Sequence, residues 1–363
     1  MNSAGSTPNS TKIGFLLLSN AGQPIPSTRI SVLNMLPFLR AAQFDPYIVF
    51  EPLQNTETPD VSGLAERLKA EGFQIIYFQK VHGSSAVALA GELRLAGIKS
   101  VFGVCDLVEP AMVEATDATI TVTDYLKSLH PPALQTKITT VHDGIERPLP
   151  HKNDWGTHSG SRTTPLRAVL VTSAGLDRLP VLVNPPNWLH VTIVGRYPAT
   201  QQRLQRLREA RWQLAGLSRW TDKLGFARFL ANPRIAREAW DAEGVYTAMQ
   251  EADIGIIPIE TDPGQGALTG WQVKSENRLT MKMAMGLPVV ATPIPAYEAV
   301  VQQGANAFLA RNRVEWLSSL ALLRDPNTRR LMGQQARQTA LAEYSMERQA
   351  AKLIAVLRGL IAL

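Results

Sequence analysis

The chain has 363 residues, enough for about two domains that each bury a core. Its single cysteine excludes an internal disulfide, and its hydrophobic content of 45% is ordinary for a globular protein. The net charge of +6 is uneven: residues 1–150 hold 11 Lys and Arg against 14 Asp and Glu, so the basic excess lies in the second half. A basic half favours a polyanionic ligand such as a nucleoside diphosphate, an anionic membrane surface or a nucleic acid.

No segment is predicted to cross a membrane. The N-terminus is polar, and the first apolar run, 13–18, is too short for a signal-peptide core or a transmembrane span. We therefore expect a cytoplasmic protein, which includes a protein bound peripherally at the inner face of the membrane.

Strand and helix patterns alternate through the first half. A strand at 12–18 leads through a turn-rich loop to a helix at 27–40, with Ser27 or Thr28 as its N-cap. Further strands are expected at 47–50, 74–79, 99–104, 118–122 and 138–141, with helices at 61–71 and 86–96. This alternation predicts a doubly wound parallel α/β sheet, whose ligands sit beyond the C-terminal ends of its strands. The residues to watch are those that follow strands, namely Lys80, His82, Cys105 and Asp106.

A second alternation follows a segment, 148–164, that is rich in Pro, Gly, Ser and Thr and is the predicted linker. Strands are expected at 167–172, 190–194, 253–257, 287–292 and 305–310. Two similar halves in tandem predict two facing Rossmann-like domains, 12–147 and 165–344.

Residues 201–240 are strongly basic, with nine Lys and Arg against three Asp and Glu. A basic helix is expected at 201–215, and Trp212, Trp220 and Trp240 lie in the same region. We favour a solvated helix face with the three tryptophans in the core. The alternative is a membrane-surface or acceptor-binding face.

The most informative run is 252–301. A buried strand leads to a loop containing Gly264, Gly266 and Gly270, then to a polar helix start with Lys274 and Arg278, and then to another strand. Free N–H groups and the helix dipole make such a helix start an anion site, and the two cations add full charges. We interpret it as the seat of a diphosphate.

This run resembles the donor-binding segment of bacterial GT-B glycosyltransferases, similar to the large retaining family 4. The family pattern is a D-I-G-I-x-P strand followed by K-S-x-N-K-x-x-E-x-M-A-x-G-x-P-V-V-A-T. It is matched by Lys274, Ser275, Asn277, Arg278, Met283, Ala284, Gly286, Pro288 and 289–292. Met281 stands where the family usually has a ribose-binding glutamate, and Glu276 is the candidate replacement.

The resemblance extends to other segments. Residues 27–30 resemble the family's S-x-R-I-R start, 142–146 resemble its I-P-N-G-V-D element, and 345–363 resemble the terminal helix that crosses back to the first domain. It implies the GT-B fold, with an N-terminal acceptor domain and a C-terminal nucleotide-sugar donor domain.

The candidate site residues divide by domain. Donor contacts are expected from Gly175, Arg178, Lys274, Glu276, Asn277, Arg278 and Glu298. In the first domain the resemblance implies His82 near the transferred sugar, with Lys80 competing for that position. Asp106 is the candidate partner of an acceptor hydroxyl, and Arg29 the candidate phosphate contact from that side. Together His82, Asp106 and Lys274 form the expected catalytic set.

The predicted function is glycosyl transfer from a nucleotide-sugar to a glycan, lipid-linked or small-molecule acceptor, as in polysaccharide biosynthesis. Retention of configuration follows from the resemblance alone. The resemblance implies that no metal or cofactor is needed, because cations and a helix start stabilise the departing diphosphate in such enzymes. The absence of a D-x-D pair in the sequence is consistent with this expectation.

Two alternatives remain open. A catalytically silent relative that binds a glycan or a partner is motivated by Met281, and binding of nucleoside diphosphates would distinguish it. Another GT-B enzyme, such as a nucleotide-sugar epimerase, would need converging acid and base groups that the sequence does not show. Nucleic acid is not an expected partner, because no reading motif accompanies the basic residues.

Overall fold

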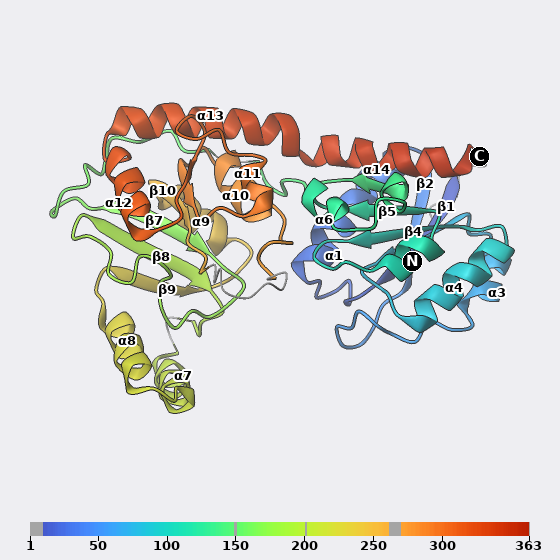
Figure 1. The fold of residues 1–363 in the computed structure, drawn as a ribbon, viewed down its shortest axis with the longest axis horizontal. Helices are drawn as coiled ribbons and strands as arrows, with labels where there is room; N and C mark the ends of the chain where they lie inside the picture. The colour runs from blue at the N-terminus through green and yellow to red at the C-terminus, as the bar shows by residue number, and fades with distance from the viewer. Residues whose placement is uncertain (1–9, 149–150, 200–201, 261–269, 363) are drawn as a thin grey trace. The chain divides into compact units, whose positions relative to one another are not determined.

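The computed structural model describes residues 10–148, 151–199, 202–260 and 270–362. The chain divides into two compact units (Figure 1). Unit 1 comprises Met1–Glu146, Leu268–Asn277 and Glu343–Leu363, and unit 2 comprises Arg147–Ala267 and Arg278–Ala342. Each unit contains a six-stranded parallel sheet with helices on both faces, as predicted.

The elements of unit 1 are β1 (Thr11–Leu17), α1 (Pro26–Ser31), η1 (Leu33–Met35), α2 (Leu36–Ala41), β2 (Phe44–Phe50), α3 (Leu64–Ala70), β3 (Ile75–Gln79), α4 (Ser84–Leu95), β4 (Lys99–Val104), α5 (Pro110–Ala115), β5 (Ala118–Thr121), α6 (Asp124–Ser128), η2 (Gln135–Lys137), β6 (Ile138–Thr140) and α14 (Met346–Ile361). The strand order is β2-β1-β3-β4-β5-β6. The order reverses between β1 and β3, and ligands of such sheets bind at that switch point, outside the strand C-termini.

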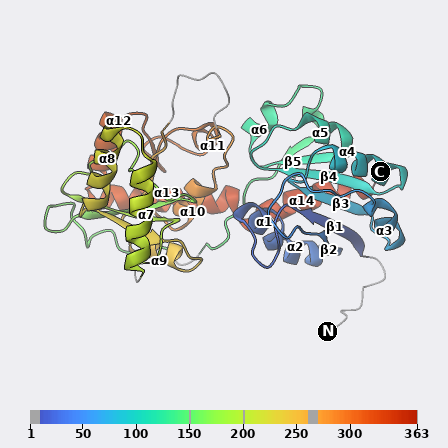
Figure 2. The same cartoon turned by 90° about the horizontal axis from the view of Figure 1, so that it is seen from below.

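Two apolar cores sandwich the sheet of unit 1. Phe78 and Phe102, paired across β3 and β4, pack under α3, α4 and α5, whereas Phe15 and Tyr77 face α2 and α14. Figure 2 shows this layering of helices on the two faces of the sheet. Because both faces are covered, the central strands β1, β3 and β4 are mostly apolar and buried.

The prediction of one continuous helix at 27–40 is wrong. The segment forms α1, η1 and α2 in succession, because the backbone leaves the helical region at Val32 (φ −126°, ψ −66°) and Pro37 has no N–H to donate to the carbonyl of Leu33. The predicted cap is also wrong: Ile25 is the N-cap of α1 and Pro26 begins the helix. Thr28 instead donates a hydrogen bond to Gln79 Oε1 at 3.1 Å.

The elements of unit 2 are β7 (Leu166–Val171), β8 (Leu189–Gly195), α7 (Arg203–Gly216), α8 (Trp220–Ala231), β9 (Ile235–Ala239), α9 (Gly244–Glu251), β10 (Ile254–Ile257), α10 (Asn277–Ala284), β11 (Val289–Ala291), α11 (Pro295–Glu298), β12 (Phe308–Leu309), α12 (Arg313–Leu322) and α13 (Pro326–Tyr344), of which α10 and α13 reach one or two residues into unit 1. The strand order is β12-β11-β10-β7-β8-β9. Renumbered from the first strand of the unit, this is the Rossmann order 3-2-1-4-5-6 read backwards, with the switch point between β7 and β10.

The tryptophans of the basic region are not in the core, so that prediction is wrong. Trp212 and Trp220 are each 77% exposed and Trp240 is 44% exposed. The expected basic helix is present as α7, and α8 follows it (Figure 2). The burial of apolar residues is a statistical tendency and not a requirement for each residue.

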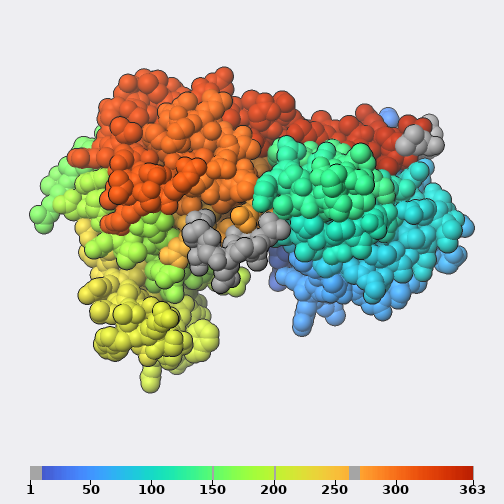
Figure 3. All heavy atoms as spheres, viewed as in Figure 1, coloured from blue at the N-terminus to red at the C-terminus, as the bar shows by residue number. Residues whose placement is uncertain are grey.

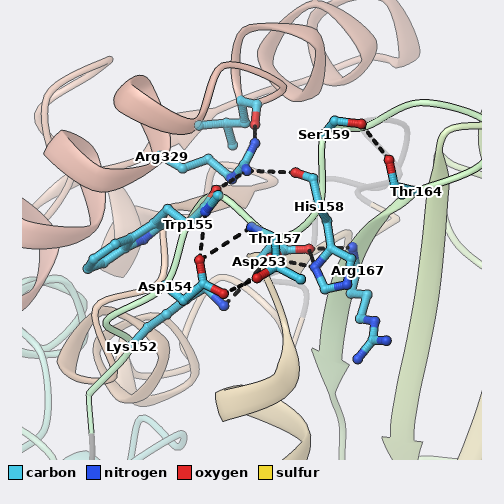
Figure 4. Close-up of polar contacts among 12 residues, drawn as sticks. Lys152, Asp154, Trp155, Thr157, His158, Ser159, Thr164, Arg167, Asp253 and Arg329 are labelled. Atoms are coloured by element: carbon cyan, nitrogen blue, oxygen red, sulfur yellow. Dashed lines mark hydrogen bonds and ion pairs between the residues drawn. The ribbon is translucent and has the colours of Figure 1, made fainter.

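Residues 151–164, which lie within the predicted linker, contain no helix or strand and are attached to unit 2 by two buried charged groups (Figure 4). His158 Nδ1 lies 3.0 Å from the carboxylate of Asp253, which immediately precedes β10 and is 1% exposed. Arg329 of α13 is fully buried and donates hydrogen bonds to the backbone carbonyls of Trp155 and His158. The segment therefore follows the surface of unit 2.

The last helix returns to unit 1, as the predicted fold requires. Ser345 caps α14 by accepting a hydrogen bond from the backbone N–H of Arg348. The backbone N–H of Ile145 donates to the carbonyl of Tyr344 at 2.9 Å, and Leu353 and Leu357 of α14 are buried in the core of unit 1.

Candidate functional site

The strand ends of unit 1 hold a network of ionised side chains. Lys80 follows β3, and its Nζ lies 2.6 Å from Oδ1 of Asp106, which follows β4. The same Nζ lies 2.5 Å from Oε1 of Glu57, a residue of the loop after β2. The parallel register of β3 and β4 pairs Gln79 with Gly103, so the residues that follow emerge at one edge.

Lys80 has an unusual backbone conformation. Its φ is +57°, in the left-handed region that non-glycine residues seldom occupy, and its N–H donates to the Gly103 carbonyl at 2.8 Å. Only 7% of the residue is exposed. Burial lowers the pKa of Lys80, but the adjacent carboxylates outweigh burial and hold it above its ordinary value. Strained backbone that fixes a buried charge at a strand end is typical of functional sites.

Lys274 completes this network. Residues 270–277 are assigned to unit 1, and Lys274 Nζ lies 2.5 Å from Asp106 Oδ2. Burial raises the pKa of Asp106, but hydrogen bonds from Lys274 and Lys80 lower it to about 2. Asp106 is therefore a permanent carboxylate held between two ammonium groups, and Lys274 is still 45% exposed.

His82 lies at the margin of the network. Its Nε2 is 3.7 Å from Glu57 Oε2, and its Nδ1 is 3.9 Å from Glu109 Oε2. Both separations exceed hydrogen-bonding distance. The backbone N–H of His82 donates to the Glu57 carbonyl at 2.8 Å, which places the imidazole beside the carboxylates.

A second cluster follows β6. His142 Nδ1 lies 3.0 Å from Glu276 Oε1 and 3.0 Å from the carbonyl oxygen of Val122. Glu276 is 1% exposed, although its position in sequence suggests a helix start open to solvent. Burial lowers the pKa of His142, but the Glu276 carboxylate outweighs burial and the pKa is raised. Glu276 is thus the buried ionic partner of a histidine.

Asp143 lies beside this pair. Ser275 Oγ donates a hydrogen bond to Asp143 Oδ2 at 2.6 Å. Burial raises the pKa of Asp143 to about 6, and the nearby Glu276 carboxylate adds to the shift. Burial also raises the pKa of the Cys105 thiol, which is therefore neutral and unreactive at physiological pH.

A cavity of about 20 Å³ lies under the strand ends of unit 1. Its walls include Tyr77, Lys80, Cys105, His142 and Asp143. A volume of this size holds about one water molecule, which the polar walls could hydrogen-bond. The Tyr77 ring occupies the space above Gly103, where an added Cβ would lie 2.0 Å from the tyrosine oxygen.

Arg29 is neutralised by a carboxylate of its own unit. Its Nε and Nη2 donate to the two oxygens of Glu146 at 2.6 and 3.0 Å, and Asn34 donates to the same carboxylate at 2.9 Å. The bidentate geometry is that of a strong, oriented pair. Arg29 is 30% exposed, so one side of the guanidinium reaches solvent.

In unit 2, the predicted donor residues gather at the switch point. Arg278, in the first turn of α10, places Nη2 3.3 Å from Oγ of Ser173, just after β7. Gly175 follows in the same loop, and a Cβ there would lie 2.6 Å from the Arg196 carbonyl oxygen. Only glycine allows the loop after β7 to pass this close to the loop after β8.

Two further predicted donor residues of unit 2 form exposed pairs. Arg178 contacts Glu260 after β10, and these side chains are 57% and 48% exposed. Glu298, in α11, lies 3.5 Å from Arg311, with side chains 50% and 67% exposed. Arg178 thus shares the switch point with Arg278, whereas Glu298 belongs to a separate surface pair.

The predicted residues therefore fall into distinct groups. Unit 1 contains Lys80, His82, Asp106, Lys274, Glu276, Asn277 and Arg29, and unit 2 contains Gly175, Arg178, Arg278 and Glu298. Asn277 is the first residue of α10, so Lys274 precedes the helix. Gly264 and Gly266 lie outside the described residues. Met281 packs partly buried against an apolar cluster containing Val245 and Leu287.

The sequence analysis did not select Glu57, Ser173 or Glu260, which contact predicted residues in the structure. It also did not select Asp143 and Ser275, which hydrogen-bond to one another. Asp143, Ser173 and Glu260 lie two or three residues after a strand, so the rule that ligands bind at strand ends could have selected them. In the described part of the chain, no three carboxylate, imidazole or thiol groups are placed to share a metal ion. Across the same residues, no helix is both long and apolar enough to span a membrane.

Comparison with known proteins places these sites in context. Residues 196–355 match the family described as glycosyl transferase-like. No curated protein matches the chain in sequence. A glycosyltransferase from Rickettsia africae superposes with a TM-score of 0.65 at 10% identity, covering 97% of this chain and 99% of that one.

Two other solved structures are similar over their whole length. The HepE protein of Anabaena, solved in complex with UDP, gives a TM-score of 0.61 at 13% identity, covering 96% of this chain and 100% of that one. The sucrose-phosphate synthase of Thermosynechococcus elongatus gives 0.59 at 12% identity, covering 97% and 99%. The chain has the GT-B fold. At such low identities the likeness establishes the fold and leaves the activity to the chemistry of the site.

Proposed function

We propose that the protein is a glycosyltransferase that moves a sugar from a nucleotide-sugar donor to an acceptor hydroxyl. The observation that carries this proposal is the glycosyl transferase-like match over 196–355, because the matched segment contains both Lys274 and Arg278. Cationic side chains at the strand ends of both units support it.

The diphosphate of the donor is assigned to the switch point of unit 2. Arg278 of α10 contacts Ser173 in the loop after β7, and Arg178, further along that loop, contacts Glu260 after β10. The pair between Arg178 and Glu260 is more than 40% exposed on both sides, so an incoming phosphate can replace the carboxylate at little cost. The Anabaena protein has been solved with UDP and with UDP-glucose, which makes uridine the first base to test.

The acceptor hydroxyl is assigned to Asp106 in unit 1. A carboxylate with a pKa of about 2 is too weak a base to remove a hydroxyl proton fully, but it is a permanent hydrogen-bond acceptor. Lys274, which is 45% exposed, lies beside this carboxylate and holds it in place. The acceptor oxygen bonds to the anomeric carbon as the bond to the diphosphate breaks, and the departing diphosphate takes the acceptor proton. His82 is assigned a contact to the transferred sugar.

Cation-based stabilisation of the leaving diphosphate predicts a reaction that needs no divalent metal. We further propose retention of anomeric configuration, a glycan or lipid-linked acceptor and a place in polysaccharide biosynthesis in the cytoplasm. The test is hydrolysis of UDP-glucose, UDP-N-acetylglucosamine, GDP-mannose and ADP-glucose with and without EDTA. Hydrolysis of one donor, unaffected by EDTA and lost in Lys274→Ala, would support the proposal; no hydrolysis of any of them would contradict it.

A second candidate is a catalytically silent GT-B protein that binds a glycan or a partner. The observation that favours it is Met281, which packs with the apolar cluster of unit 2 where the resembling family has a ribose-binding glutamate. Such a protein would bind glycans in an array while showing no affinity for nucleoside diphosphates. Titration of UDP into the unchanged protein separates the two, because only a donor-binding protein would bind it.

A further inference from the structure

The helical pair α7–α8 presents apolar side chains to solvent. The two helices lie next to one another beyond the β9 edge of the unit 2 sheet (Figures 1 and 2). In α7, Leu204 is 74% exposed, Leu207 67% and Trp212 77%, and none of its fourteen residues is buried. A helix in a globular protein normally buries one apolar face. This face of α7 is uncovered.

The exposed apolar residues share one side of each helix. At 100° per residue, Leu204, Leu207 and Trp212 fall within about 140° of the circumference of α7, with Arg208 and Arg211 between them. In α8, Phe226 and Phe229 are buried in the core of unit 2, whereas Trp220 and Leu224 lie one turn apart on the exposed side. The apolar side chains are interleaved with cations.

The surface is also strongly cationic. Residues 202–228 contain seven Lys and Arg against two Asp and Glu. Arg206 donates hydrogen bonds to the backbone carbonyls of Pro198 and Arg237, so it has a structural role. The exposed arginines of this region are Arg203, Arg208, Arg211, Arg219 and Arg228. Figure 3 shows this region, in yellow and yellow-green, extending below the remainder of unit 2 in that view.

We propose that the α7–α8 surface is a docking site for an anionic phospholipid bilayer. Exposed tryptophans settle at the level of lipid headgroups, leucines enter the acyl boundary, and each Lys or Arg near an anionic surface adds attraction. A second copy of the chain fits less well, because two surfaces of net positive charge repel one another. A nucleic acid would leave Leu204 and Leu207 without an apolar partner. This inference does not depend on sugar transfer.

The test is flotation of the full chain with vesicles of phosphatidylcholine alone and with vesicles in which phosphatidylglycerol replaces part of it. We expect binding only to the anionic vesicles, weakening as salt is added because the attraction is screened. Tryptophan emission should shift to shorter wavelength on binding, as Trp212 and Trp220 leave water. Absence of binding to anionic vesicles at low salt would overturn the proposal.

Paired variants locate the binding surface. Trp212→Ala with Trp220→Ala removes the apolar anchors, and Arg208→Glu with Arg211→Glu reverses two charges between them. Each double variant should bind about tenfold more weakly or worse. The matched control is Arg330→Glu with Leu331→Ala on α13, where Leu331 is 52% exposed, and it should bind as the unchanged protein does.

Circular dichroism and melting temperature show whether the variants remain folded, and the charge variant, which alters only exposed side chains, is expected to melt unchanged. Binding that persists in both folded double variants would place the lipid contact elsewhere and overturn the proposal. The proposal would also be overturned if the protein does not bind anionic vesicles but instead self-associates or binds a DNA duplex, and the double variants lose that interaction.

Discussion

The charged side chains at the strand ends are mostly buried in unit 1 and exposed in unit 2. In unit 1, the Lys80 side chain is 8% exposed and contacts two carboxylates, and Asp106 contacts two lysines. In unit 2, the Arg178 side chain is 57% exposed and contacts Glu260, which is also exposed. Ligands of parallel sheets bind at both edges. The charges at the edge of unit 1 already neutralise one another, whereas the charges at the edge of unit 2 are accessible to a ligand.

This difference indicates how each edge can work. A buried, mutually satisfied network is costly to break, so the edge of unit 1 holds its geometry before any ligand arrives. An exposed ion pair contributes little stability, so the edge of unit 2 can exchange its carboxylate partner for phosphate oxygens. The comparison predicts that substitutions in the buried network of unit 1 affect folding and activity together, whereas substitution in the exposed pair of Arg178 and Glu260 in unit 2 affects ligand binding.

The largest effect is expected from Asp106→Asn. The variant leaves the ammonium groups of Lys80 and Lys274 adjacent without a carboxylate between them. A shift of the pKa from 3.8 to about 2 corresponds to about 2 kcal/mol of unfolding free energy, present above pH 4 and lost as the pH falls towards 2. Urea unfolding of parent and variant at pH 7 and pH 3 measures this contribution. Equal stability of the two proteins at pH 7 would contradict a stabilising role for the Asp106 carboxylate.

The next largest effect on the free energy of unfolding is expected from Gly175→Ala in unit 2. The added Cβ would meet the backbone carbonyl of Arg196 at 2.6 Å, so the loop after β7 must move. We expect a loss of about 1–3 kcal/mol in unfolding free energy, with weaker nucleotide binding. Gly216→Ala is the control, because a Cβ there meets nothing within 4 Å. Equal stability of Gly175→Ala and Gly216→Ala would show that the close approach of the two loops is not required.

Besides Asp253 and Arg329, unit 2 contains a further buried ionisable group, Lys282. It is fully buried in α10 against Gly255, and burial lowers its pKa to about 7, with Arg278 adding to the shift. Between pH 7 and 10.5 the unfolded chain holds this proton and the native chain does not, so this group makes stability rise with pH, by at most about 1.4 kcal/mol per unit.

Lys282→Met should therefore stabilise the protein most at pH 7, and the gain should shrink as the pH rises. Melting temperatures of parent and variant from pH 7 to 9 measure the difference. A gain that does not change with pH would contradict a neutral Lys282 in the folded state.

The smallest effect on stability is expected from Arg178→Ala. Its pair with Glu260 is exposed, so unfolding free energy should change by less than about 1 kcal/mol. Affinity for a nucleoside diphosphate should nevertheless fall, and Arg311→Ala, which removes the equally exposed pair with Glu298, serves as the control. If both variants bind the diphosphate equally well, Arg178 is not part of the donor site.

Much of the fold was predictable because alternating apolar strands and helices allow few arrangements. The strand-end rule selected Lys80 and Asp106, but the ion pairs depend on Glu57 and Lys274, which are distant in sequence and meet only through the fold. The burial of Glu276 beside His142 gave no local signal. The exposure of Trp212 and Trp220 was missed because apolar residues are usually assigned to a core.

The central claim is that cations at the strand ends of unit 2 bind a nucleoside diphosphate. Isothermal titration of UDP, GDP, ADP and TDP into the full chain, the Arg278→Ala variant and the Arg330→Ala variant tests it most directly. We predict saturable binding of at least one nucleotide, weakened about tenfold or more in Arg278→Ala and unchanged in Arg330→Ala. Absence of binding for all four nucleotides, or equal binding in the Arg278 variant, would contradict the account.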